Sequence, residues 1–199
     1  MQLRFSPTSP YVRKVVVTAH ELGLADRVEL ITTNPWVPDP ALFRDNPLGK
    51  VPALTTDEGD VLFDSPVICE YLDSLAGPRL IPDAGRARWQ ALRLQALGDG
   101  LLDAAVLWRL ETQRPADERS SDWQVLQQDA VSRSLDALEH EAAHWAEDVN
   151  IGHVTAGCAL GYLDFRFASD GWREEHPTLA AWYQDFAARP SMIATVPKG

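Results

Sequence analysis

The sequence predicts a small α/β domain over residues 1–77 followed by an all-helical domain over residues 86–199. Residues 2–77 alternate between short β-branched runs and runs with an apolar helical face, whereas strand signals almost disappear after residue 85. The segment GPRLIPDAG (77–85) carries the glycine and proline residues expected of a linker between the two parts. A chain of 199 residues is long enough for one full core or two small ones.

The first part is predicted to have the element order β-α-β-α-β-β-α. Gly23 and Gly77 follow the two longer helices, as is typical of helix ends, and DEGD (57–60) supplies the turn of a hairpin. The expected elements are a strand ending at 4–5, a helix over 10–22, a strand over 27–33, a short helix over 41–46, hairpin strands over 52–56 and 61–63, and a helix over 66–76.

The second part consists of long runs with helical periodicity, separated by the polar segments RPADERS, VNIG and SDGWREEHP. The predicted helices cover residues 86–113, 120–148, 151–168 and 177–189.

The composition argues against several classes of function. A net charge of −11 disfavours nucleic acids and anionic membranes as partners, because both require a basic face. The two cysteines, Cys69 and Cys158, lie in apolar helical stretches without a CxxC pattern, so we expect no disulfide framework and a cytoplasmic location. We also expect neither a signal peptide at the start nor a membrane span, since no run of about 18 apolar residues occurs.

The segment HEAAH (140–144) has the spacing of a zinc-protease motif, in which two histidines bind the metal and the glutamate is the general base. In a helix, however, His140 and His144 lie opposite the apolar stripe. Glu147 and Asn150 stand where the metzincin pattern has glycine and histidine. We therefore expect a solvated face in the middle of a helix and no metal site.

The pairs Ser9-Pro10 and Ser65-Pro66 each precede a helical run. Serine is favoured as an N-cap and proline at the first helical position, so each pair should open a helix. The free N–H groups and positive dipole end of such a helix can bind an anion. The alternative is that each pair is only a helix cap.

Val51-Pro52 stands immediately before a strand pattern, where a proline cannot donate to the sheet. A cis bond at this position would leave the backbone groups of Val51 free to pair with an extended ligand.

Together, SPTSPYVRKV, NPLGKVPALTTDEG, DSPVICEYL and GYLDFR resemble the cytosolic glutathione transferases over essentially the whole chain. The resemblance is strongest to bacterial members with a serine-type or cysteine-type active site, and Ser9 indicates the serine type. It implies a thioredoxin-like domain, then an all-α domain, with glutathione as co-substrate and no permanently bound cofactor. It also implies a cytoplasmic homodimer with a role in detoxification.

The resemblance implies that Ser9 stabilises the glutathione thiolate. The thiolate is the nucleophile, and a hydroxyl donor at a helix N-terminus favours this anion over the neutral thiol. Thr8 and Ser6 are rival hydroxyls, and Ser9 as a purely structural cap is the remaining alternative.

The same resemblance implies a set of glutathione-binding residues. The backbone of Val51, before a cis Pro52, would pair with the cysteinyl unit, and Asp64 with Ser65 would hold the γ-glutamyl end. Lys50 would reach the glycine carboxylate. Alternatively, Asp64 is a solvated turn residue and Lys50 a surface lysine.

The acceptor, a small hydrophobic electrophile, is expected to lie against the first long helix of the second part. Leu102, Val106, Trp108 and Arg109 are candidates for its pocket, with plain helix packing as the alternative.

One position departs from the family. Its later buried helix usually begins with a capping box, in which a carboxylate three residues after the N-cap accepts the N-cap N–H. Asn150 can still serve as N-cap, but we expect that His153 cannot take the carboxylate's part in the same way.

The predicted function is conjugation of the glutathione thiolate to a small electrophile. A second possibility is glutathione-dependent reduction of peroxides or disulfides, although a serine at position 9 argues against a mixed disulfide on the enzyme. A third is a non-catalytic module that binds a protein partner, which would not require Ser9, Pro52, Asp64 and Ser65 together.

Overall fold

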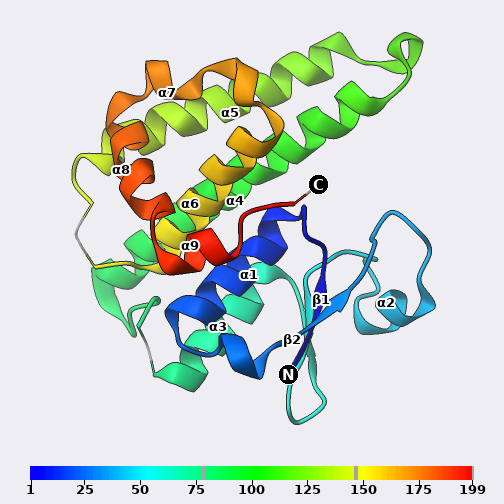
Figure 1. Cartoon of the computed structure of the whole chain (residues 1–199). Coiled ribbons are helices and arrows are strands. Elements are labelled where there is room, and N and C mark those ends of the chain that lie inside the picture. The colour runs from blue at the N-terminus through cyan, green and yellow to red at the C-terminus, as the bar shows by residue number, and fades with distance from the viewer. Residues whose placement is uncertain (78, 146–147, 199) are drawn as a thin grey trace. The chain divides into compact units, whose positions relative to one another are not determined.

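The computed structural model describes residues 1–77, 79–145 and 148–198, and these residues form two compact units. The first unit comprises Met1–Trp89 together with Pro190–Gly199, and the second comprises Gln90–Arg189. The described residues of the first unit contain both strands and helices, whereas those of the second contain only helices (Figure 1). The predicted fold class, an α/β part followed by an all-helical part, is confirmed.

The sheet of the first unit has four short strands in the order β2-β1-β3-β4. β1 runs parallel to β2 and antiparallel to β3, and β3 forms a hairpin with β4. Leu3 and Leu54 face each other across β1 and β3 and are fully buried, so they fix the register through the core. The strands cover Gln2–Phe5 (β1), Glu29–Thr32 (β2), Ala53–Thr55 (β3) and Val61–Leu62 (β4).

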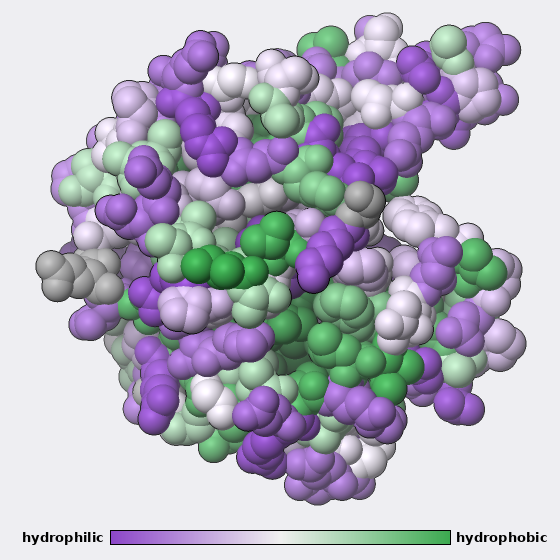
Figure 2. Space-filling view, in the orientation of Figure 1, coloured by the Kyte–Doolittle hydropathy of each residue, from purple (hydrophilic) through white to green (hydrophobic). Residues whose placement is uncertain are grey.

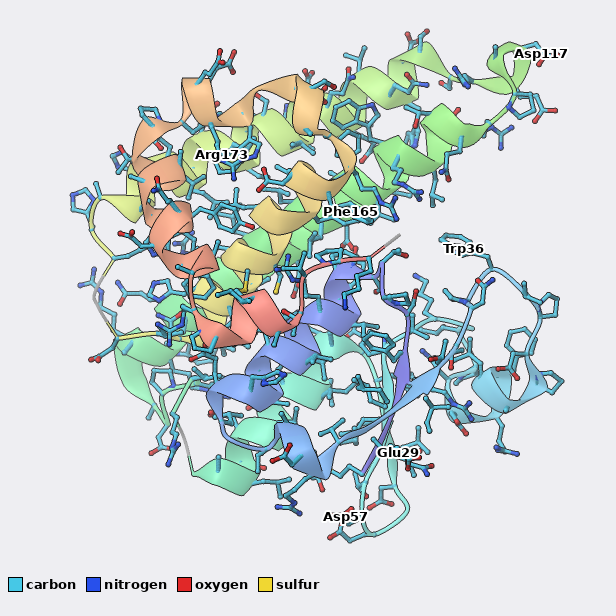
Figure 3. All side chains as sticks on the ribbon, viewed as in Figure 1. Glu29, Trp36, Asp57, Asp117, Phe165 and Arg173 are labelled. Atoms are coloured by element: carbon cyan, nitrogen blue, oxygen red, sulfur yellow. The ribbon has the colours of Figure 1, made fainter. Side chains whose placement is uncertain are left out.

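Asp57 in the turn between β3 and β4 ties this hairpin to the start of the chain (Figure 3). Its carboxylate accepts hydrogen bonds from the N-terminal ammonium at 2.6 Å and from Arg27 at 2.9 Å. These two bonds lower the pKa of Asp57. The face drawn in Figure 2 is hydrophilic over much of its area, with hydrophobic residues gathered near its centre.

Helices α1 and α3 lie on one side of the sheet and α2 on the other (Figure 1). The predicted strand over 27–33 begins later than expected, because a 3₁₀ turn occupies Ala25–Arg27. A short helix near the C-terminus, α9, was not predicted; Arg13 of α1 donates to the Met192 carbonyl of α9 at 3.2 Å. The helices cover Pro10–Glu21 (α1), Pro40–Asp45 (α2), Ser65–Ala76 (α3) and Pro190–Ala194 (α9).

The helical unit is built around α6, in which every residue from 151 to 163 is buried. A Cβ on Gly152 would lie 2.6 Å from the Leu94 Cβ, so α4 and α6 pack too closely there for any side chain. The helices cover Gly85–Gln113 (α4), Ser121–Ala142 (α5), Ile151–Arg166 (α6), Trp172–Glu175 (α7) and Pro177–Ala187 (α8). Across the described ranges, none of the helices has the length and apolar character needed to span a bilayer.

Two predictions about this unit are wrong. The helix expected over 120–148 ends at Ala142, so His140 lies in its last turn and His144 in the following turn, not in mid-helix. Residues 146–147 of the expected helix lie outside the described residues. The segment SDGWREEHP is not only a separator, because it contains α7.

The start of α6 corrects the expectation for His153. Asn150 caps the helix through its side chain, which accepts from the Gly152 and His153 N–H groups at 2.9 and 3.2 Å. In return, the Asn150 N–H donates to Nδ1 of His153 at 3.3 Å, which completes a capping box. A neutral imidazole nitrogen is an acceptor, so His153 does take the place of the usual carboxylate.

This arrangement predicts a stability that depends on pH. Burial lowers the pKa of His153 to about 4, opposed by a backbone contact with Asp148. Because the unfolded chain has the ordinary value of 6.5, only the unfolded state takes up the proton between pH 6.5 and 4. The free energy of unfolding should therefore be fully retained above pH 6.5 and fall by roughly 3 kcal/mol as the pH drops to 4.

Urea denaturation at several pH values measures this effect. His153→Gln is the matched control, because glutamine can still accept the Asn150 N–H but does not titrate. Its stability should fall less steeply over the same range, and equal slopes in the two proteins would contradict the role of His153.

Candidate functional site

Ser9 is the N-cap of α1, as predicted. Its Oγ accepts the Val12 N–H at 3.3 Å, which orients the hydroxyl at the positive end of the helix. Within the described part of the chain, the Ser9 hydroxyl proton has no acceptor. The site thus offers an oriented O–H donor whose proton is uncommitted, as stabilisation of an anion requires.

The second serine–proline pair lies at the start of α3, but the N-cap stands one residue earlier than expected. The N-cap is Asp64, and Ser65 is the first residue of the helix. The Asp64 carboxylate makes no capping hydrogen bond and is exposed, while Ser65 is buried. Neither side chain has a hydrogen-bond partner among the described residues, so both groups are available at a helix N-terminus, which favours an anionic ligand.

The bond between Val51 and Pro52 is cis, as the resemblance implied. Val51 is partly exposed, and its N–H and C=O make no hydrogen bond within the part that the structure describes. Lys50 is exposed, and its carbonyl accepts from the Asn46 side chain at 2.9 Å. An extended ligand could therefore pair with the backbone here, beside a lysine side chain.

The strand register brings the segments that carry Ser9, Val51-Pro52 and Asp64-Ser65 to the same end of the sheet. Arg4 at the end of β1 pairs with Ala53 at the start of β3, and Leu54 pairs with Leu62 at the end of β4. The chain leaves β1 toward Ser9 and leaves β4 toward Asp64, whereas it enters β3 from Pro52. The residues predicted to bind glutathione therefore gather where these strand ends meet.

The candidates for the acceptor pocket lie in different surroundings. Leu102 is fully buried, whereas Val106, Trp108 and Arg109 are partly exposed on α4. Trp108 stacks on Phe167 of the helical unit, with ring centroids 4.1 Å apart. Leu102 thus fits the alternative of plain packing.

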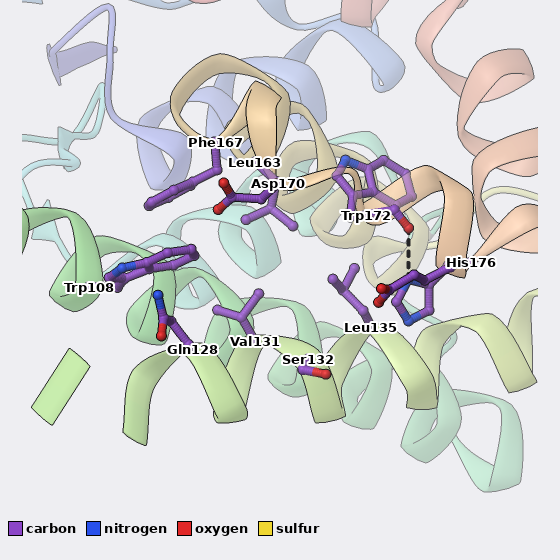
Figure 4. Close-up of a pocket in the computed structure, with 11 residues that line it drawn as sticks. Trp108, Gln128, Val131, Ser132, Leu135, Leu163, Phe167, Asp170, Trp172 and His176 are labelled. Atoms are coloured by element: carbon purple, nitrogen blue, oxygen red, sulfur yellow. Dashed lines mark hydrogen bonds between the residues drawn. The ribbon is translucent and has the colours of Figure 1, made fainter. Parts of the chain in front are cut away.

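Trp108 also lines a cavity of about 200 Å³ within the helical unit (Figure 4). Trp108 and Phe167 stand at one end of this cavity and Trp172 and His176 at the other. The remaining lining residues are Gln128, Val131, Ser132, Leu135, Leu163, Asp170 and Glu175. The lining of the cavity is aromatic and acidic, with Asp170 and Glu175 among its residues.

The HEAAH segment forms no metal-binding cluster with the rest of the described chain. Within residues 1–77, 79–145 and 148–198, no group of three or more histidine, cysteine, aspartate or glutamate side chains could hold a metal ion. Both His140 and His144 are exposed.

Comparison with known proteins identifies the family of this chain. Residues 8–75 match the family described as "Glutathione S-transferase, N-terminal domain", and residues 83–185 match "Glutathione S-transferase, C-terminal domain". An uncharacterised GST-like protein of Escherichia coli, YibF, is 35% identical over 99% of this chain and 98% of its own length.

Solved structures are also similar. A glutathione transferase family member from Pseudomonas fluorescens, with bound glutathione, is 48% identical and has a TM-score of 0.94 over 100% of this chain and 99% of its own. A glutathione S-transferase from Methylobacillus flagellatus, also with glutathione bound, is 35% identical with a TM-score of 0.93 over 99% of both chains.

These neighbours share the thioredoxin-like plus all-α architecture of the two units. The two family matches together span most of the sequence, and the relatives match it almost end to end. The chain therefore belongs to the glutathione S-transferase superfamily.

Proposed function

We propose that this protein is a serine-type glutathione transferase that conjugates the glutathione thiolate to a small hydrophobic electrophile. The observation that carries the proposal is the Ser9 hydroxyl, which is oriented by the Val12 N–H and keeps its proton uncommitted. A thiol with a pKa near ~8.5 is mostly protonated at neutral pH, so a donor to its sulfur and a helix dipole raise the fraction of the reactive thiolate.

In this proposal the first domain, residues 1–77, binds glutathione through a few residues besides Ser9. The Val51 backbone, held beside Pro52, pairs with the cysteinyl unit. Ser65 and the start of α3 take the γ-glutamyl carboxylate, Asp64 faces the ammonium, and Lys50 faces the glycine carboxylate. The helical domain, 86–199, contributes the electrophile pocket. In a second Pseudomonas fluorescens structure, 46% identical, the bound molecule is S-(propanoic acid)-glutathione, which supports thioether products for this chain as well.

Calorimetry with glutathione tests the proposal at its first step. We expect saturable binding that weakens at least tenfold in a Ser65→Ala, Asp64→Ala double variant, because both ends of the γ-glutamyl group lose a charged or polar partner. Asp60→Ala, in the exposed turn before β4, is the control and should bind as the wild type does. Absence of binding by the wild type would favour the non-catalytic module instead.

The proposal includes a cytoplasmic homodimer. Neither Cys69 nor Cys158 forms a disulfide and both are buried, which suits a reducing compartment. In the first unit, exposed large apolar side chains between β2 and the start of β3 supply a surface that a second copy would cover; they are Trp36, Val37, Phe43 and Leu48. Sedimentation equilibrium giving the mass of a single chain would contradict this part.

A further inference from the structure

The cavity between α5, α6 and α7 lies entirely within the helical unit, because all the residues that line it fall between Trp108 and His176 (Figure 4). Its volume is about 200 Å³. An engineered cavity of about 150 Å³ in another protein holds benzene, whereas sites for drug-sized ligands have roughly 300–1,000 Å³. The space therefore suits a small molecule with a single ring.

The floor and the two ends of this cavity are apolar. Its floor consists of buried aliphatic residues of α5 and α6, namely Val131, Leu135 and Leu163. At one end Trp108 stacks on Phe167, with ring centroids 4.1 Å and planes 15° apart, and at the other end stands Trp172. An apolar ring placed on this floor would lose its contact with water and pack between aromatic side chains.

The end formed by Trp172 and His176 is held in place by hydrogen bonds. The indole Nε1 of Trp172 donates to Asp164 at 3.0 Å. Nδ1 of His176 lies 2.8 Å from the Trp172 carbonyl, the contact dashed in Figure 4, and its Nε2 lies 3.1 Å from the Asp136 carboxylate. A wall that is already ordered costs a ligand less entropy on binding.

The rim of the cavity is polar and acidic. Asp170 and Glu175 are exposed there, beside the exposed side chains of Gln128 and Ser132. Neither carboxylate forms an ion pair with a described residue, and Asp170 accepts only the hydroxyl of its neighbour Ser169, at 3.2 Å. In the part of the chain that the structure describes, no lysine or arginine lines this cavity. The rim thus offers acceptors and negative charge without a cation of its own.

We propose that this cavity binds a small primary ammonium ion that carries one apolar ring. The ring lies on the aliphatic floor, and the ammonium group, which has three donors and no acceptor, lies at the rim and donates to Asp170 and Glu175. Aromatic rings attract cations, and Trp172 already has the Arg173 guanidinium 4.6 Å from its ring centroid. The inference goes beyond the proposed function, since neither glutathione nor its acceptor takes part in it.

Three ligands with the same ring and similar chains test the charge preference: 2-phenylethylamine, 2-phenylethanol and 3-phenylpropionate. Each is titrated into the full chain while nuclear magnetic resonance follows the indole N–H signals of Trp108 and Trp172. We expect saturable binding of the amine with a Kd on the order of 1 mM. The alcohol should bind at least about fivefold more weakly, and the carboxylate should show no saturation, because it meets the acidic rim.

Isosteric variants of the rim test the two carboxylates. Asp170→Asn and Glu175→Gln should each weaken binding of the amine about threefold and together about tenfold, while the affinity for the alcohol stays within about twofold. Glu174→Gln is the matched control, because Glu174 is an exposed neighbour on α7 that does not line the cavity. It should bind the amine as the wild type does.

A cavity-filling variant tests the location. Ser132 lies at the exposed rim, so Ser132→Trp should occupy the space and abolish binding of the amine and of the alcohol. The double variant of Asp170 and Glu175 carries the test if Ser132→Trp fails to fold.

Several results would overturn the inference. These are no binding of the amine, equal binding of the amine and the alcohol, or undiminished binding of the amine by the double variant. Unchanged binding by a folded Ser132→Trp would place the ligand elsewhere and overturn it as well. None of these experiments contains glutathione, so the proposed transferase activity stands or fails independently of them.

Discussion

Replacing Ser9 by alanine is expected to lower kcat/KM for glutathione conjugation by roughly 100-fold while changing the affinity for glutathione only a few-fold. Removing one preorganised donor to a developing anion has an effect of this size in other enzymes. The hydroxyl is oriented by the Val12 N–H and can donate a hydrogen bond to the sulfur. Because it favours the thiolate over the thiol, its loss should raise the pKa of bound glutathione.

The measurement is the ultraviolet absorbance of the thiolate in the enzyme–glutathione complex as a function of pH, together with initial rates. Ser9→Ala should move the titration to higher pH. An unchanged titration curve would remove Ser9 from the proposed role. Thr8→Ala and Ser6→Ala are tested beside it, because a loss that followed either of them would transfer the role to that hydroxyl.

A further variant separates the donor from the helix cap. Ser9→Asp keeps an oxygen that can accept the Val12 N–H, but it has no hydroxyl proton to donate. If Ser9 acts through its O–H group, Ser9→Asp should be as inactive as Ser9→Ala, although its stability should remain near that of the wild type. Activity near the wild-type level would show that only the cap matters.

The location of the candidate site could be predicted from the sequence because it depends on local signals. Serine followed by proline is favoured at a helix start, and Ser9-Pro10 and Ser65-Pro66 do stand at helix starts, whereas Ser6-Pro7 is followed by a turn. The one-residue shift at α3, where Asp64 is the N-cap, arises because aspartate and serine are equally good caps and stand side by side. The strand register that brings the segments of Ser9, Val51 and Asp64 to one end of the sheet could be seen only in the structure.

The positions at which helices end were predicted less accurately than the presence of the long helices. The helical periodicity of residues 120–148 correctly predicted that a helix is present there. No glycine or proline marks the end of this helix, α5, at Ala142. His153 was misjudged for a chemical reason, since only a carboxylate was considered as acceptor and the neutral imidazole was not. The first error concerns where a helix ends and the second the chemistry of a local cap, and neither changes which helices are present.

Asp73 makes a set of stabilising hydrogen bonds that the sequence did not reveal. It lies on α3 with 3% of its surface exposed, near the C-terminal end of the helix, where a negative charge is opposed by the dipole. Its carboxylate accepts three backbone N–H groups, from Arg79 at 3.1 Å, Leu80 at 2.8 Å and Ile81 at 3.1 Å. The segment expected to be a plain linker is therefore anchored to the first unit by one side chain.

Asp73→Ala is accordingly expected to lower the free energy of unfolding by about 4 kcal/mol, because it leaves three N–H groups, two of them on buried residues, without an acceptor. Asp73→Asn keeps one oxygen and should lose about half as much. Urea denaturation followed by circular dichroism measures both, with the exposed Asp83→Ala as a control expected to stay within about 0.5 kcal/mol of the wild type. A loss for Asp73→Ala no larger than that of this control would mean that the backbone of residues 79–81 finds water as readily as it finds the carboxylate, and that the linker needs no anchor.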